Sequence, residues 1–112
     1  MNLRDQILNS QDYQTKEIEV PEWDCTLTIR GLSAKGFMAF QQASMQAQED
    51  DMLSGLATAL IFGVIDEEGR CVFTKKDMNK LMEKSTSVIL RVGAEVITLS
   101  GFDETEEDIE KN

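Results

Sequence analysis

The sequence has no histidine, one proline and two cysteines among its 112 residues. Without histidine, Ser–His–Asp triads, Cys–His pairs and most zinc sites are excluded. The seven glycines are scattered singly, so no glycine-rich loop is present to hold a phosphate. Cys25 and Cys71 lie outside any Cys-x-x-Cys spacing, and with no export signal we expect reduced, structural thiols. These absences predict a protein that is not an enzyme and holds no cofactor.

Basic residues are also scarce, and the acidic excess is uneven. The chain has 11 Lys and Arg against 21 Asp and Glu, a net charge of −10. This balance argues against a nucleic-acid partner, because such a protein needs cations facing the phosphates. Residues 103–112 hold six acids and one lysine, which is half of the excess. We expect residues 102–112 to form a disordered acidic tail, since so polar a segment cannot fold alone.

Long apolar runs are missing as well. The longest, Leu56–Ile65, is about half the length that a membrane-spanning helix needs. The amino terminus lacks the basic start and continuous apolar block of a signal peptide. We therefore expect no membrane partner and a cytoplasmic location. The expected organisation is an arm or short helix over residues 1–16, one α+β domain over residues 17–101, and the tail.

The pattern of apolar residues predicts an α+β fold, in which an N-terminal β-hairpin is followed by about four helices in a small bundle. Apolar and polar residues alternate on both sides of the "PEWD" turn, from Glu17 to Ile29, as in a pair of short strands. Ser33 is a good N-cap for the first helix of the bundle, with Leu32 and Phe37 at the positions of a hydrophobic staple.

Two apolar stripes predict the main helices. The stronger runs over Leu53, Leu56, Ala57, Leu60, Ile61 and Val64, widened by Phe62 and Ile65, and we expect it to mark the most buried helix. The other runs from about Ser85 through Val88, Ile89, Val92, Val96 and Leu99 to a stop at Gly101.

The segment "DEEGRCVFTKKD", Asp66–Asp77, has the outline of a calcium loop but fails its requirements. Arg70 stands at the fifth position, where an oxygen ligand is needed, and Cys71 at the sixth, where the sharp turn needs glycine. We therefore predict no metal site. The residues fit a turn with Gly69 at positive φ, a short extended piece, and a helix capped by Thr74 and Asp77.

With no catalytic or metal site predicted, the function is expected to depend on surfaces that contact other proteins. The chain has six methionines, and methionine-lined surfaces adapt to varied partners, although methionine at helical spacing is more often part of a core. Trp23 in the turn either anchors the hairpin or offers a contact. The candidate residues for binding a protein partner are Trp23, Phe37, Met38, Phe40, Met45, Met78 and Met82.

The order of the motifs carries a family resemblance. "VPEW" leads into the strand "CTLTIRGLS" and a helix, and "FGVIDEEGRCVFTKKDMNKLMEKS" then precedes an apolar helix that closes at "LSG". From Val20 to Gly101 the chain resembles the tail assembly chaperones of long-tailed bacteriophages. The resemblance implies a cytoplasmic chaperone without catalysis. It also implies that the chaperone binds the tape-measure protein, keeps it soluble and helps to recruit tail-tube subunits, with self-association along that client.

Two further hypotheses concern the acidity and the last residues. Glu110-Lys111-Asn112 can be encoded by a slippery heptamer, so a programmed frameshift near this point would produce a longer form, as in many members of that family. The alternative function is an acidic decoy that imitates DNA and blocks a DNA-binding enzyme. A decoy should spread carboxylates over its folded surface, whereas half of the excess here lies in residues 103–112.

Overall fold

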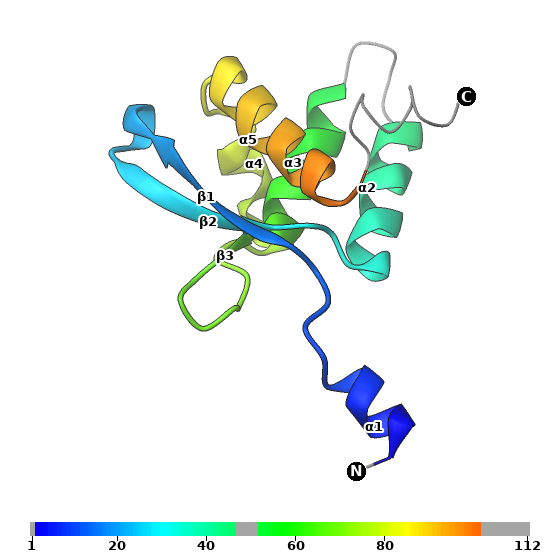
Figure 1. Ribbon diagram of the computed structural model, residues 1–112. Helices are drawn as coiled ribbons and strands as arrows, with labels where there is room; N and C mark the ends of the chain where they lie inside the picture. The colour runs from blue at the N-terminus through cyan, green and yellow to red at the C-terminus, as the bar shows by residue number, and fades with distance from the viewer. Residues whose placement is uncertain (1, 47–51, 102–112) are drawn as a thin grey trace, which may run out of the picture.

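The computed structural model describes residues 2–46 and 52–101 (Figure 1). A three-stranded antiparallel sheet lies against a group of helices that cover one of its faces, and its strands follow in the order β1 (Thr15–Val20), β2 (Cys25–Arg30), β3 (Val64–Ile65). Helix α1 (Leu3–Leu8) stands apart from the other elements at the end of an extended segment. This is the predicted α+β arrangement of a hairpin followed by helices. The predicted acidic tail lies outside the described residues.

The hairpin forms where the alternation predicted it. Strands β1 (Thr15–Val20) and β2 (Cys25–Arg30) pair in unbroken register from Thr15 opposite Arg30 to Val20 opposite Cys25. The 3-10 turn Pro21–Trp23 joins them, and Asp24 closes that turn in the left-handed region at φ 56°. Proline and aspartate favour such a turn, because proline presets its own φ and aspartate tolerates positive φ.

A third strand follows the central helix, where the sequence pattern predicted more helix. Helix α3 (Met52–Gly63) ends at Gly63, and β3 (Val64–Ile65) then pairs with β2. The prediction that Val64 and Ile65 extend the helical stripe is therefore wrong. Both side chains are buried, but on the sheet. Two β-branched residues after a glycine suit a strand better than a helix end.

The core lies between the sheet and the helices. Helix α3 packs between α2 (Ala34–Gln46) and α5 (Thr86–Leu99), as expected of the most buried helix. The apolar side chains with at most 7% of their surface exposed come from the sheet and from the helices: Val20, Ile29, Ala57, Ala59, Leu60, Ile61, Val64, Ile65, Leu81, Val88, Ile89, Val92 and Val96. The predicted α5 stripe is thus confirmed, and Gly101 after α5 has the positive φ (100°) of a C′ residue.

Predicted caps appear at two helix starts. The Ser33 hydroxyl accepts the backbone N–H of Gly36 at 3.1 Å, which caps α2. Thr74 and Asp77 form a reciprocal capping box, in which the Asp77 carboxylate accepts the N–H of Thr74 at 2.8 Å. The helix that this box starts is shorter than the sequence suggested. It consists of a 3-10 turn, Lys75–Asp77, and α4 (Met78–Leu81).

Candidate protein-interaction surfaces

Apolar side chains that the core does not use define the candidate surfaces. A large apolar side chain that is exposed to water can stabilise a complex, because its burial at an interface contributes about 1.5–3 kcal/mol of favourable free energy. Among the described residues, the exposed large apolar side chains lie on α1, on α2, in the extended piece after the Asp66 loop, after α4 and on α5: Leu3, Ile7, Leu8, Met38, Met45, Val72, Met82 and Leu90.

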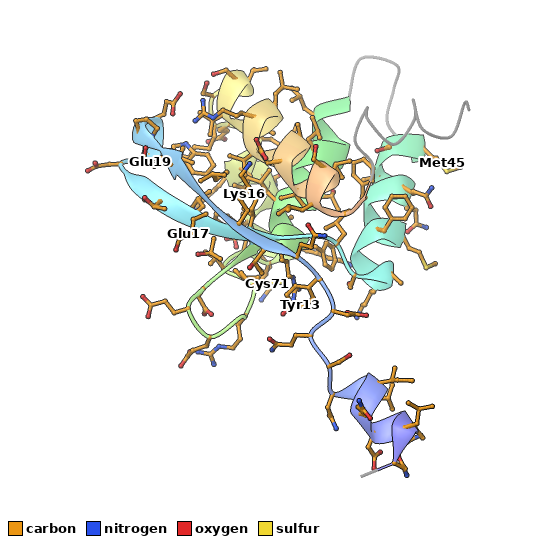
Figure 2. The ribbon with its side chains drawn as sticks, in the orientation of Figure 1. Tyr13, Lys16, Glu17, Glu19, Met45 and Cys71 are labelled. Atoms are coloured by element: carbon orange, nitrogen blue, oxygen red, sulfur yellow. The ribbon has the colours of Figure 1, made fainter. Side chains whose placement is uncertain are left out.

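Helix α2 carries the methionines that the sequence marked as surface candidates. Met38 is 68% exposed and Met45 is 83% exposed, and the two stand seven residues apart on the same helix face. Figure 2 shows Met45 near the end of α2, far from the hairpin. We name this face, Met38 and Met45, the α2 methionine face.

The other candidates on this side of the molecule serve packing. Phe40 and Met78 pack against the buried core. The rings of Phe37 and Phe40 lie in a tilted pair with centroids 6.0 Å apart. Met78 also lines a groove of about 310 Å³ between α2, α3 and the start of α4, which we name the α2–α3 groove. Its lining residues are Ala39, Gln42, Ala43, Thr58, Ile61, Phe62, Lys75 and Met78.

Trp23 lies at the hairpin turn, away from α2 (Figure 1). It is half-buried and packs against the core, as an anchor of the hairpin would, and its use as a client contact stays a prediction. Together with Phe73 and Leu81 it lines a groove of about 470 Å³ at the hairpin tip. The candidate residues therefore lie in three separate places: on and beside α2, at the hairpin turn, and after α4, where Met82 is 38% exposed.

Helix α1 (Leu3–Leu8) is an apolar surface that the candidate list missed. Asn2 caps it by accepting the N–H of Asp5 at 2.8 Å, yet no residue of the helix is buried. Leu3 and Ile7 share one face at i and i+4 spacing, and Leu8 lies beside them. The weak apolar spacing in the sequence was the available signal. A six-residue helix is marginal in water by itself, so α1 is an element suited to docking on a partner.

Sequence comparison decides the family. A family model described as "Phage tail assembly chaperone" matches residues 2–112, nearly the whole chain. The chain belongs to the phage tail assembly chaperones. No curated protein sequence matches it. Its structure resembles that of the bacteriophage HK97 tail assembly chaperone, with a TM-score of 0.67 and 17% sequence identity over 90% of this chain and 96% of that one. At this identity the structural match supports the fold.

An ion pair fastens the hairpin turn of the chaperone to α5. Both oxygens of the Glu22 carboxylate accept hydrogen bonds from the Arg91 guanidinium, at 2.8 and 3.1 Å. This hydrogen bonding, more than any other cause, lowers the pKa of Glu22 from 4.5 to about 2. Since the folded-state pKa is depressed, the stabilisation is present above about pH 4.5 and is lost as the pH falls through about 2.

This ion pair gives a direct prediction. In an NMR titration the Glu22 side chain should titrate near pH 2, and in Arg91→Gln it should return toward 4.5. Asp66 is an internal control, because backbone N–H groups, first that of Arg70, lower its pKa. Its midpoint should stay depressed in Arg91→Gln. A Glu22 midpoint near 4.5 in the wild-type protein would show that the pair does not form.

The loop that outlined a calcium site is organised by its own backbone. One oxygen of Asp66 accepts the N–H groups of Glu68 at 2.8 Å and Arg70 at 3.0 Å, and the other faces the Arg70 side chain at 3.7 Å. Gly69 has the predicted positive φ of 82°. Within residues 2–46 and 52–101 no three acidic, cysteine or histidine side chains gather as metal ligands do. The loop thus closes a turn, and a bridge between Ile65 and Cys71 continues the sheet.

Arg30 joins three distant segments of the chaperone, and no sequence pattern predicted this. Its Nε donates to the carbonyl of Phe62 at 3.1 Å, and its guanidinium lies 4.9 Å from the centre of the Tyr13 ring. A terminal nitrogen lies 3.6 Å from the sulfur of Cys71. Figure 2 shows Tyr13 and Cys71 close together below the sheet. Arg30 therefore fixes where the segment before β1 leaves the sheet.

Both thiols of the chaperone are free and exposed, so neither fills the core as the expected structural role would require. None of the helices in the described ranges combines the length and apolarity needed to cross a bilayer.

The outer face of the sheet, away from the helices, is polar and acidic. An open groove of about 690 Å³ runs along it, lined by Glu17, Thr26, Leu27, Thr28, Val64, Ile65, Asp66, Glu67, Glu68 and Val72. Glu68 pairs with Arg70 within the loop. Glu17 and Glu67 have no ion-pair partner among the described residues. This face therefore carries a local negative potential that opposite charges on a partner can neutralise.

Proposed function

We propose that this chaperone binds the tape-measure protein of its phage, keeps that long chain soluble, and helps to recruit tail-tube subunits around it. It does so without catalysis, in the host cytoplasm, with several copies on one client. Membership of the phage tail assembly chaperones supports the general role. The observation that supports direct client binding is the set of apolar side chains that a complete core leaves exposed on α1 and α2.

The α2 methionine face and α1 suit a client with amphipathic helices. Methionine is flexible and polarisable, so Met38 and Met45 can cover apolar stripes of differing shape. The stripe on α1 can lie along a client helix in the same way. The acidic charge of the chaperone then keeps neighbouring complexes apart in solution. Family membership favours this function over the acidic decoy.

Substitution on the α2 methionine face tests this proposal. Met45→Ser should weaken binding to the tape-measure protein about tenfold, because losing one buried methionine contact costs at least about 1.4 kcal/mol. The measurements are the dissociation constant and the soluble fraction of tape-measure protein after co-expression. Thermal unfolding should not change, since Met45 is 83% exposed.

Thr98→Ser is the control, because Thr98 is an exposed polar residue of α5, outside the α2 methionine face. It should leave both measurements at their wild-type values. A wild-type chaperone that neither binds nor solubilises the tape-measure protein would refute the proposed function. If Met45→Ser binds the tape-measure protein as tightly as the wild type does, the α2 methionine face is not part of the client-binding surface.

A further inference from the structure

The outer edge of β1 is an unpaired strand edge that runs the full length of the hairpin. The sheet order places β1 at the edge, with β2 on its one paired side. The backbone N–H of Gly31 donates to the carbonyl of Gln14 at 2.9 Å, in the same register as the β1–β2 pairs. In an antiparallel pair, hydrogen-bonded and non-hydrogen-bonded residues alternate. Thr15, Glu17 and Glu19 therefore direct their N–H and C=O groups away from β2.

Most of the usual protections of an edge strand are absent from β1. Natural edges are blunted by bulges, by proline, by covering elements, by very short length or by charged side chains, and of these β1 has the charges of Lys16, Glu17 and Glu19. β1 has six residues in continuous register, and its first proline neighbour, Pro21, comes after the strand. Helix α1 and its connecting segment lead away from this edge rather than over it (Figure 1). The edge is thus a ready template for an added strand.

The side chains along this edge select for positive charge. Glu17 and Glu19 lie on the outer face of the sheet, and neither has an ion-pair partner among residues 2–46 and 52–101. The cation of β1 that directly precedes them, Lys16, points to the helix side and pairs with Glu95 of α5 at 2.9 Å. Figure 2 shows Lys16 and Glu17 on opposite sides of β1. The outer face beside the edge thus carries the two unpaired glutamates, whereas Arg30, which lies opposite Thr15 on this face, is directed to Tyr13, the Phe62 carbonyl and Cys71.

A second copy of β1 is a poor occupant of this edge. Antiparallel self-pairing about Glu17 sets Glu17 opposite Glu17, and the neighbouring registers set Glu17 opposite Glu19 or Lys16 opposite Lys16. Like charges directly opposite one another destabilise a sheet. An extended segment with Lys or Arg at alternate positions instead places its cations directly opposite Glu17 and Glu19, because residues paired across a ladder share a face.

We propose that the outer edge of β1 binds an extended, cationic segment of the tape-measure protein as a fourth strand. The identity of the client rests on the proposed function. The added strand forms main-chain hydrogen bonds with Thr15, Glu17 and Glu19, and its alternate cations neutralise the two glutamates. Client binding then has two parts, with apolar helix contacts on the α2 methionine face and a charged strand contact on this edge.

A proline on the edge separates this contact from the fold. Proline at 17 removes an N–H that faces solvent and keeps every β1–β2 bond, and prolines occur in edge strands at such positions. Glu17→Pro should weaken binding to the tape-measure protein about tenfold or more, corresponding to about 1.4 kcal/mol. Glu19→Lys, which leaves the backbone intact, should weaken it similarly, and Glu83→Lys is the control with equal charge change at an exposed site off the sheet.

A synthetic peptide in which lysine alternates with valine tests the edge without the client. On peptide binding, the amides of Thr15, Glu17 and Glu19 should gain protection from hydrogen exchange by NMR, while a peptide with glutamate in place of lysine should give none. If the lysine peptide protects these amides but the chaperone does not bind the tape-measure protein, the β1 edge is a strand-binding site and the proposed function is refuted. The proposal is overturned if Glu17→Pro and Glu19→Lys bind the client like wild type, or if the lysine peptide leaves those amides unprotected.

Discussion

Leu60→Ala is expected to lower the free energy of unfolding by about 2–5 kcal/mol. Leu60 has no exposed surface and lies in α3, the helix between α2 and α5. Removing its terminal carbons forfeits the transfer free energy of those atoms and leaves a cavity that the packed neighbours on both sides cannot close. Urea unfolding followed by circular dichroism measures the change, as a lower midpoint at an unchanged slope.

Two companion variants make the Leu60 result interpretable. Leu60→Met keeps the volume and should cost less than about 1.5 kcal/mol, so it remains folded if the alanine variant does not. Leu90→Ala removes the same atoms from α5 at a site that is 37% exposed, and should cost clearly less than Leu60→Ala. Equal losses at positions 60 and 90 would contradict the placement of the core between the sheet and the helices.

Gly31→Ala is expected to cost about 1–3 kcal/mol, through overpacking rather than backbone strain. A β-carbon at residue 31 would lie 2.7 Å from the carbonyl oxygen of Leu99 and 3.0 Å from its carbonyl carbon. Both are backbone atoms of the last turn of α5, which cannot yield as a flexible side chain would. The neighbouring contact is tight as well, because the N–H of Leu32 donates to the Ser100 hydroxyl at 2.7 Å.

The control for Gly31 is a second buried glycine with more room. A β-carbon at Gly36 would lie 3.1 Å from the Cβ of Phe62, and alanine also favours the helix α2 by up to about 1 kcal/mol. Gly36→Ala should therefore change the free energy of unfolding by less than Gly31→Ala does. A Gly31→Ala protein with wild-type stability would show that α5 does not end against the exit of β2.

Features that depend on neighbouring residues followed from the sequence. The alternation on both sides of "PEWD" predicted the hairpin, because side chains of a strand alternate between faces whatever they pack against. The Ser33 cap and the Thr74–Asp77 box were also predictable, because a side chain three residues from a free N–H reaches it within one turn. The spacing of apolar residues in α5 likewise defined its buried face.

Features that depend on distant residues did not follow. The apolar run through Val64 and Ile65 reads equally well as buried helix or buried strand, and pairing with Thr28 and Ile29 of β2 decides it. The short α4 is a second case, since no local sequence signal predicts that the helix ends at Leu81. Arg30 is a third, because its partners Phe62 and Cys71 are far away along the chain.

The candidate surfaces divide in the same way. Composition and spacing marked the methionines and aromatics, but exposure alone separates Met38 and Met45, which face solvent, from Phe40, Met78 and Trp23, which pack against the core. Burial depends on how the sheet and the helices pack together. A stripe of apolar residues in the sequence therefore does not show which of them are buried in the core.

Local chemistry thus accounts for the elements of this chaperone, their caps and turns, its acidic charge, and motifs whose order marks its family. Contacts between distant segments decide where α3 gives way to β3, which edge of the sheet stays unpaired, and which apolar side chains remain in water. The physical reason is range. Propensity, capping and turn chemistry act over three or four residues, whereas strand pairing and burial depend on partners that only the folded chain brings together.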